Sequence, residues 1–399
     1  MVNQYNIYAG VLLNGRELPK KNINIVIENK KIISIQKAIK IDRANEKGDL
    51  IDARDYSVLP GLIDTHVHIM MDPNYGIYSW FKCLEEKEEI LLIKAANNLS
   101  ESLRSGITTV RDFGAYGNMC FILREALEKN IFKGSRLLTC GNLITLSDGH
   151  GHYIGKHADD ILEIKKAIRY LNKLNVDFIK FMPTGGRLTA ESDLRRIQYN
   201  LDEIKVFVDE AHQRRKKVAA HATVTEGIIN CVEAGVDTIE HCSWLDSDVG
   251  FKFDIEAAKK MTDKEIFVGP TLAAIAKHST NKDELEVQKE MWRKTYQAGV
   301  KMIAGTDAGV PMVKFNEMHI SIKLLVEWIG LSNLEAITAA TADSAKAIGL
   351  EDKIGTIEEG KLADIVIVDG NPINNIEILQ KVVMVIKDGE IVYRDKTKI

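Results

Sequence analysis

Hydrophobic and polar residues alternate in short runs at both ends of the chain. Near the N-terminus the alternating hydrophobic positions are Ile23, Ile25 and Ile27. A comparable pattern returns only near the C-terminus, around Asp388 and Gly389, a pair that is typical of a tight turn. Alternation with a period of two predicts half-buried antiparallel strands. We therefore expect the two ends, residues 1–57 and 358–399, to pair into one small β-sandwich.

Between the ends, short apolar runs alternate with amphipathic segments, a pattern typical of β-α-β units and a parallel sheet. The eight predicted strands span residues 59–68, 107–113, 136–140, 178–182, 218–222, 238–242, 266–271 and 301–307. The predicted helices span residues 85–105, 119–129, 160–172, 201–216, 225–234, 255–262, 285–297 and 316–328. This pattern predicts an α/β fold in which residues 58–357 form a closed (β/α)8 TIM-like barrel, with functional residues at the C-terminal strand ends.

The composition narrows the classes of function. Among 399 residues, 53 Lys and Arg stand against 57 Asp and Glu, a net charge of −4, so no overall field attracts nucleic acid or an acidic membrane. The five cysteines are scattered and never spaced Cys-x-x-Cys, which argues against disulfides or a thiolate zinc site. No apolar run is long enough to span a bilayer, and the first residues lack the pattern of a secretion signal. We expect a cytoplasmic protein that acts on a small molecule.

Polar side chains stand where several predicted strands end. His66 and His68 close the first strand, and residues two apart on a strand point to the same face, about 6 to 7 Å from each other. That spacing suits one metal ion, although two buried histidines bonded to backbone groups would leave the same pattern. The other strand-end groups are Lys180, His221, His241 and Asp307. Because the C-terminal ends of barrel strands meet at one face, we expect all of these groups to lie together.

These residue types suit a metal centre. Histidine and carboxylate ligands fit zinc, or manganese, cobalt or iron at similar geometry. The ammonium group of Lys180 would repel a metal ion, so this lysine fits only as a neutral amine or as a carbamate made with carbon dioxide, unless it simply reaches solvent. Two divalent ions, zinc being the first choice, could hold a bridging hydroxide and polarise a carbonyl while Asp307 takes and returns the proton.

Motifs along nearly the whole chain resemble those of a known superfamily. They lie at residues 60–68, 106–112, 178–186, 239–241, 305–309 and 354–364. In these segments the chain resembles the amidohydrolase superfamily of metal-dependent hydrolases. Within that superfamily it is similar to the imidazolonepropionase-like and prolidase-like group, which includes Xaa-Pro dipeptidases and carboxypeptidases. The resemblance implies a (β/α)8 barrel with a β-sandwich made from both termini, and relatives are often homo-oligomers.

The resemblance also implies which residues bind the metals. One metal would have three ligands, the other would have two, and the carboxylated lysine would bridge them. The ligands are His66, His68 and Asp307 for one metal, His221 and His241 for the other, and Lys180 as the bridge.

Substrate-binding residues are expected in two loops. The glycine-rich loop 147–153 carries His150 where relatives have a histidine that faces the substrate. Arg187 follows a Gly-Gly pair and could clamp a substrate carboxylate in a bidentate fork, although a solvated loop arginine is the alternative. Thr223 departs from the pattern, because peptidase relatives often carry tyrosine two places after the strand 5 histidine.

The first hypothesis is a binuclear hydrolase that cleaves the amide bond of a dipeptide or N-acyl amino acid. The alternative is a mononuclear deaminase or a cyclic-imide hydrolase of the imidazolonepropionase type. Such enzymes usually lack the bridging lysine, and deaminases place glutamate three residues after the strand 5 histidine, where this chain has Val224. A non-catalytic scaffold would be expected to have lost ligands, and none is missing.

Overall fold

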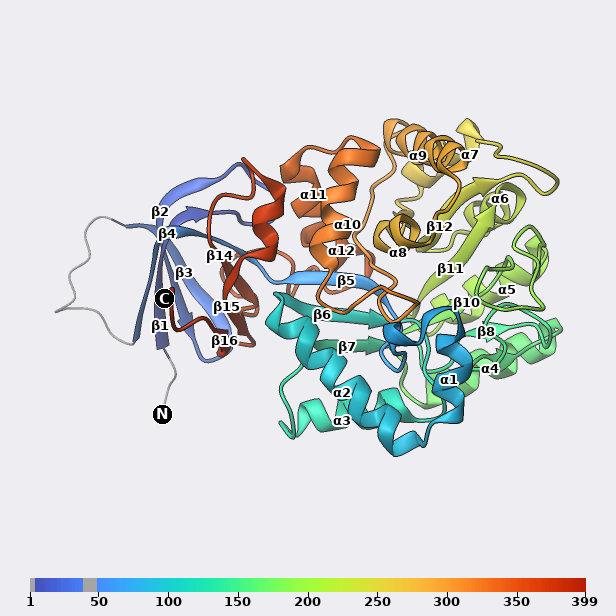
Figure 1. The fold of residues 1–399 in the computed structure, drawn as a ribbon, viewed down its shortest axis with the longest axis horizontal. Coiled ribbons are helices and arrows are strands. Elements are labelled where there is room, and N and C mark those ends of the chain that lie inside the picture. Colours follow the sequence, from blue (N-terminus) through green and yellow to red (C-terminus); the bar gives the residue numbers. More distant parts are fainter. Residues whose placement is uncertain (1–3, 39–48) are drawn as a thin grey trace.

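Strands from both ends of the chain lie together in one sheet at one end of the molecule (Figure 1). The computed structural model describes residues 4–38 and 49–399, and for residues 76–80 it describes the backbone alone. The sheet has seven strands in the order β16-β15-β14-β4-β1-β2-β3. Their bounds are β1 Gln4–Leu12, β2 Lys20–Glu28, β3 Lys31–Lys37, β4 Asp49–Pro60, β14 Ile365–Val368, β15 Val382–Lys387 and β16 Glu390–Arg394.

The pairing of the two ends runs through β4. This strand pairs in parallel with β1 and antiparallel with β14, so it joins the N-terminal strands to the C-terminal ones. The turn predicted between β15 and β16 is present, and Asp388 and Gly389 have the positive φ angles of 49° and 75° that such a turn requires. The two ends therefore pair as expected, in one continuous sheet, and the β-sandwich stays a prediction.

The terminal sheet buries a hydrophobic cluster of its own, because alternate residues of its strands point to one face. Most strands contribute at least one buried isoleucine to the cluster. Examples are Ile7, Ile25, Ile32, Ile51, Ile365 and Ile386.

The middle of the chain is an α/β fold with parallel strands. Among the described residues these strands form two sheets, β5-β6-β7 and β13-β12-β11-β10-β8-β9, so the closed barrel stays a prediction. In the first sheet the bounds are β5 Leu62–Val67, β6 Ile107–Asp112 and β7 Arg136–Thr139. In the second they are β8 Ile144–Thr145, β9 Lys156–His157, β10 Phe178–Phe181, β11 Lys217–Val224, β12 Thr238–Leu245 and β13 Phe267–Gly269.

The last predicted strand, residues 301–307, is not a regular strand. Its backbone still contacts both sheets, since the N–H groups of Val268 and Thr65 donate to carbonyls in this segment at 3.0 and 3.1 Å. Its ladder is limited to an isolated bridge between Met302 and Val268, and Asp307 at its end has a φ of 65°, in the left-handed region. The segment therefore lies between β13 and β5 and ends beside the last residues of β5.

Helices follow most strands and pack on the outside of the two sheets (Figure 1). Their bounds are α1 Ser79–Glu85, α2 Glu88–Arg104, α3 Met119–Glu128, α4 Ile161–Lys173, α5 Leu201–His212, α6 Thr225–Ala234, α7 Ile255–Asp263, α8 Leu272–His278, α9 Lys282–Gln297, α10 Met318–Leu324, α11 Asn333–Ala339 and α12 Ala342–Ala347. A π-helical turn, Leu325–Ile329, continues α10, and 3-10 turns lie at Pro73–Tyr78 and Ile376–Gln380. The helices α1, α8, α11 and α12 were not predicted, because two turns or fewer are too short to show a helical period.

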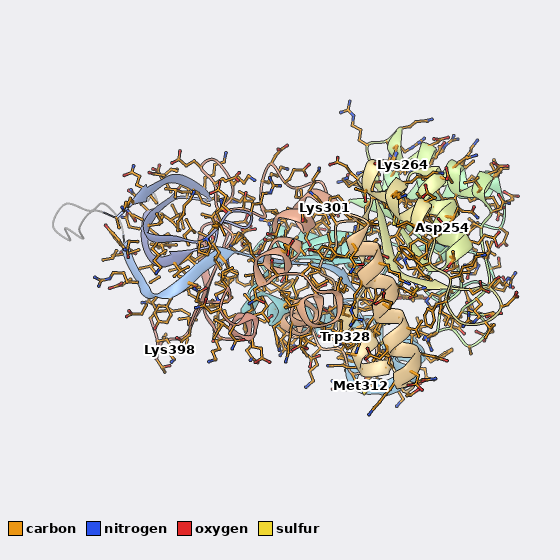
Figure 2. All side chains as sticks on the ribbon, turned by 90° about the horizontal axis from the view of Figure 1, so that it is seen from above. Asp254, Lys264, Lys301, Met312, Trp328 and Lys398 are labelled. Atoms are coloured by element: carbon orange, nitrogen blue, oxygen red, sulfur yellow. The ribbon has the colours of Figure 1, made fainter. Side chains whose placement is uncertain are left out.

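The terminal sheet and the outer helices of the α/β part mark opposite ends of the molecule. Figure 2 shows Lys398 at the sheet end, and Asp254 and Lys264, which flank α7, at the far end. The helices of the described residues are all too short or too polar to cross a bilayer.

Candidate active site

One pocket contains all the residues that were predicted to bind a metal or the substrate. It opens where the C-terminal ends of β5, β10, β11 and β12 meet. The predicted residues that line it are His66, His68, His150, Lys180, Arg187, His221, His241 and Asp307. The tertiary structure thus brings together side chains that are far apart in the sequence, and the role of each stays a prediction.

The first two histidines sit at the end of β5. Their ring centroids lie 5.5 Å apart, and both side chains are buried. The ring of His66 stacks on Phe113, with centroids 4.0 Å apart and planes 8° from parallel. This stacking restricts the plane of the His66 ring, whose Nε2 lies 3.4 Å from the Asp307 carboxylate.

The next two histidines come from β11 and β12, and their ring centroids lie 4.4 Å apart. His221 Nε2 lies 3.2 Å from the carbonyl oxygen of Gly185. A carbonyl only accepts, so Nε2 donates and Nδ1 is left to face the pocket. His241 shows the opposite arrangement, because its Nδ1 lies 2.8 Å from the hydroxyl of Thr271. Each ring therefore has one nitrogen held by the protein and one available to a ligand.

Asp307 joins these groups from the end of the segment 301–307. Its Oδ1 lies 3.4 Å from His66 Nε2 and 3.2 Å from His68 Nε2. His66, His241 and Asp307 each offer one ligand atom, and these three atoms lie within 4.8 Å of one another. Imidazole nitrogens and a carboxylate oxygen are the borderline and hard ligands that zinc and similar ions prefer, so these three donors already suit a metal ion.

Lys180 on β10 is the buried cation of the pocket. Its side chain is 1% exposed, and its Nζ has no hydrogen-bond partner among the described residues. Its Nζ lies 4.3 Å from the centroid of the Phe113 ring. Burial lowers the pKa of Lys180 to about 8. A buried amine with a lowered pKa and no hydrogen-bond partner is suited to react with carbon dioxide or to bind a metal.

The ionisation of the other pocket residues also fits metal ligands. Burial lowers the pKa of His66 and His221, and it lowers the pKa of His241 to about 3, so all three rings are neutral near pH 7. Burial alone would raise the pKa of Asp307, but the histidines around its carboxylate hold that pKa far below the ordinary value. Neutral imidazole and ionised carboxylate are the forms that bind metal.

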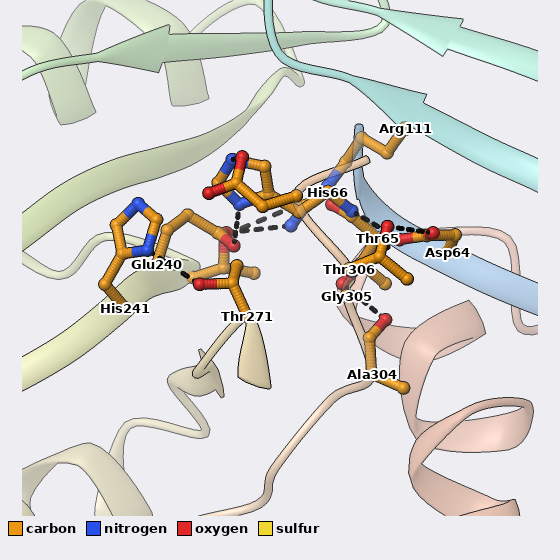
Figure 3. Close-up of polar contacts among 12 residues, drawn as sticks. Asp64, Thr65, His66, Arg111, Glu240, His241, Thr271, Ala304, Gly305 and Thr306 are labelled. Carbon is orange, nitrogen blue, oxygen red and sulfur yellow. Dashed lines mark hydrogen bonds and ion pairs between the residues drawn. The ribbon is translucent and has the colours of Figure 1, made fainter. Parts of the chain in front are cut away.

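Arg111 and Glu240 form a buried ion pair behind the pocket, which sequence reasoning did not assign. The Arg111 guanidinium donates to Glu240 Oε1 at 2.8 Å, and Glu240 Oε2 lies 3.1 Å from His66 Nδ1 (Figure 3). Both residues lay inside the recognised motifs without a role. The signal that could have found them is a charged residue of opposite sign inside each of two predicted strands, because buried charges need partners.

A second buried carboxylate, Asp64, ties β5 to the segment that carries Asp307. It accepts hydrogen bonds from the hydroxyl and the N–H of Thr306, at 2.6 and 3.0 Å, and from the N–H of His66 at 3.2 Å (Figure 3). These bonds fix the ends of two neighbouring segments relative to each other.

The predicted substrate residues also line the pocket. His150 Nδ1 lies 2.9 Å from the hydroxyl of Thr189, and a Cβ on Gly186 would lie 2.3 Å from His150 Nε2, so only glycine fits there. The Arg187 side chain is exposed. Thr223, the departure from the peptidase pattern, donates to the carbonyl of Leu194 at 3.2 Å and thus holds a loop that lines the pocket.

Much of the remaining lining is aliphatic, beside the polar Ser243 and Gln288. It includes Leu188, Leu194, Leu245, Ile275 and Val310. His278 also lines the pocket from the last turn of α8, where no role was predicted for it. A pocket that combines these polar groups with aliphatic side chains suits a small substrate with one apolar group.

Comparisons with known proteins place the chain in a family. The model of the Amidohydrolase family matches residues 57–392. Ochratoxinase from Aspergillus niger is 26% identical over 404 residues, which cover 94% of this chain and 83% of that protein. Imidazolonepropionase from Kosmotoga olearia is 25% identical, with 94% and 92% covered.

Solved structures agree with this result. The structure of a Xaa-Pro dipeptidase with bound methionine has a TM-score of 0.87 and 32% sequence identity, and the match covers 98% of this chain and all of that one. The protein is accordingly a hydrolase that acts on carbon–nitrogen bonds. The chain belongs to the amidohydrolase family.

Proposed function

We propose that this protein is a binuclear metal-dependent amidohydrolase that cleaves an amide bond in a small substrate. One observation carries the proposal. The fully buried Lys180 has no hydrogen-bond partner among the described residues, in a pocket that also holds neutral histidines and the Asp307 carboxylate. An unpartnered buried amine is costly, so its presence is best explained by a group that it would meet in the working enzyme.

The proposed ligands divide between two ions. His66, His68 and Asp307 hold one ion, and His221 and His241 hold the other. Lys180 bridges them as a carbamate, because a neutral amine is the form that reacts with carbon dioxide and its pKa of about 8 leaves part of it neutral near pH 7. When bound, the two ions, proposed to be zinc, lower the pKa of water and polarise the amide carbonyl.

Asp307 is the proposed general base and acid. Its carboxylate faces two imidazoles in the pocket, where it can take a proton from the attacking water and deliver it to the departing nitrogen. His150, whose ring is fixed by Thr189 and by the lack of a side chain on Gly186, is proposed to contact the substrate.

The substrate is proposed to be a dipeptide or an N-acyl amino acid with an apolar group. The aliphatic side chains that line the pocket support the apolar group, and the exposed Arg187 at the pocket is suited to a substrate carboxylate. Known relatives favour the same class, since one is a Xaa-Pro dipeptidase and another is a prolidase complexed with N-methylphosphonate-L-proline.

The proposal includes the finer architecture. The segment 301–307 supports a (β/α)8 barrel over residues 58–357, because it contacts a strand of each central sheet. The buried cluster of the terminal strands supports a separate β-sandwich domain made from residues 1–57 and 358–399.

Metal content per chain tests the proposed centre. Protein expressed with zinc and bicarbonate is expected to contain about two metal ions, and Lys180→Ala is expected to lose a marked share of them, because the bridge is gone. The same preparations would be assayed with dipeptides and N-acyl amino acids, and Asp307→Asn is expected to abolish turnover while the protein remains folded. One ion that Lys180→Ala leaves in place would favour the mononuclear deaminase or cyclic-imide hydrolase, and no ion would contradict the proposal.

A further inference from the structure

The buried pair of Arg111 and Glu240 lies directly behind the first proposed metal ligand. Glu240 is fully buried and Arg111 is 2% exposed. Arg111 also donates from Nε to the carbonyl of Thr65 at 2.7 Å, and its guanidinium lies 4.7 Å from the centroid of the Phe113 ring. Replacing such a pair by apolar residues is often neutral or stabilising, so stability alone gives a weak reason for it.

The contacts of Glu240 are divided between its two oxygens. Oε1 accepts from Arg111 at 2.8 Å and from the hydroxyl of Thr238 at 2.7 Å, whereas the hydrogen-bond partner of Oε2 among the described residues is His66 Nδ1. A Cβ on Gly269 would lie 2.7 Å from Oε2, so the glycine leaves room for this oxygen. The carboxylate therefore has one oxygen reserved for the imidazole.

The proton of the His66 ring has two possible acceptors. Asp307 Oδ1 lies 3.4 Å from Nε2 on the pocket side, and Glu240 Oε2 lies 3.1 Å from Nδ1 on the far side. A neutral imidazole carries one proton, and only the nitrogen without it can bind a metal. If the proton moved toward Asp307, the nitrogen that faces the pocket would be lost as a ligand.

We infer that Glu240, held by Arg111, is a positioning residue that keeps the proton of His66 on Nδ1 and so leaves Nε2 to bind metal. The inference rests on the proposed metal centre. Arg111 donates to the other oxygen of Glu240 at 2.8 Å and so holds the carboxylate in place. The pair is neutral overall, so it fixes the tautomer without adding net charge next to the site.

The variant that tests this role is Glu240→Gln, because Arg111 controls how the new amide points. The amide oxygen is expected to turn toward the guanidinium, which leaves the NH2 group to donate to His66 Nδ1. That contact favours the proton on Nε2, the wrong tautomer for a ligand. Outer partners of metal-binding histidines typically contribute about 10- to 100-fold in metal affinity, so zinc binding is expected to weaken by that factor.

Two readouts are needed. The nitrogen-15 shifts of labelled histidine in metal-free protein report the tautomer of His66, and competition with a chromophoric chelator gives the zinc dissociation constants. Glu210→Gln is the matched control, because Glu210 is also buried and paired with two arginines, Arg169 and Arg214, outside the pocket. The control is expected to keep both the parent tautomer and the parent zinc affinity.

If Glu240→Gln does not fold, the double variant Arg111→Met, Glu240→Leu removes both charges at similar volume and should fold. It is expected to bind zinc about 10- to 100-fold more weakly than the parent, since nothing then holds the Nδ1 proton. A parent tautomer together with zinc affinity within about threefold of the parent would overturn the positioning role. A parent protein that binds no zinc would instead overturn the proposed function, and this inference with it.

Discussion

Three residues in or beside the pocket have backbone angles that residues other than glycine rarely adopt. His241, Thr271 and Asp307 have φ values of 66°, 49° and 65°. Such conformations cost about 1 to 3 kcal/mol each and persist only where the surrounding structure holds them. Here the indole of Trp292 donates to the carbonyl of His241 at 2.8 Å, and the hydroxyl of Thr271 contacts the ring of His241. These side chains are thus held in position at a cost in stability, which is typical of a functional site.

The His212 side chain, outside the pocket, predicts a pH effect on stability. Its Nε2 lies 2.8 Å from Asp237, and this carboxylate raises the pKa of His212 above its ordinary value of 6.5. A raised folded-state pKa stabilises the protein below the unfolded pKa, and the contribution is lost as the pH rises through the folded pKa. His212→Gln should therefore lower the urea midpoint at about pH 5.5 and have less effect at about pH 8.5.

Because the His212 side chain is 42% exposed, the loss at low pH is expected to be at most about 1 kcal/mol. Metal-free protein should be used, since metal binding itself depends on pH. His157→Gln is the control, because its Nε2 contacts the carbonyl of His152 rather than a carboxylate. An equal effect of His212→Gln at both pH values would contradict the prediction.

At the scale of elements, one helix that leads into a pocket strand begins at a capped position. The helix α5, which leads into β11 and His221, starts at Asn200 with a capping box. The Asn200 side chain accepts from the N–H groups of Asp202 and Glu203, and the Glu203 side chain accepts from the N–H of Asn200. Such caps satisfy N–H groups that the helix itself leaves without partners.

Asn200→Ala is expected to lower the free energy of unfolding by about 1 kcal/mol, because the N–H groups at the start of α5 lose their acceptor. Asn118→Ala is the matched control, since Asn118 is also the N-cap residue of a helix, α3, but its side chain makes no capping hydrogen bond. Urea unfolding of the two variants measures the difference. Equal losses would contradict the assigned role of the cap.

At the scale of the whole molecule, Arg136 connects the α/β part to the terminal sheet. It lies at the start of β7 and donates to Asp364 at 2.5 Å and to Asp388 at 2.6 Å. The Asp364 side chain is 3% exposed. Removing one partner of a pair whose other partner is buried costs far more than breaking a pair on the surface, because it leaves a charge without water.

Arg136→Gln is expected to destabilise the protein by about 2 to 4 kcal/mol, less than for a fully buried pair because Arg136 is partly exposed. Lys133→Gln is the control at the same junction. Lys133 pairs with Glu390, and both side chains are about half exposed, so the loss should stay below about 1 kcal/mol. Hydrogen exchange of the β15 and β16 amides should quicken only in Arg136→Gln, and equal rates in the two variants would contradict the prediction.

The sequence predicted the elements well where their periodicity is strong. The alternating isoleucines marked the terminal strands, and the apolar runs that end in His221 and His241 marked β11 and β12. Side-chain periodicity is a local property, so it can be read without knowing the fold. Short helices such as α8 were missed because two turns are too short to show a helical period. The segment before Asp307 was predicted as a regular strand, because a positive φ angle leaves no trace in a hydrophobic pattern.

The chain's own pattern therefore determined which strands end in chemically active side chains and in what order. The tertiary structure decided how those side chains meet: which nitrogen of each histidine is held by the protein, and which buried charges lie behind them. Arg111 and Glu240 are far apart in the sequence, and their pairing depends on which strands become neighbours in space. Contacts of this kind arise from packing and exclusion of water, which no local pattern encodes.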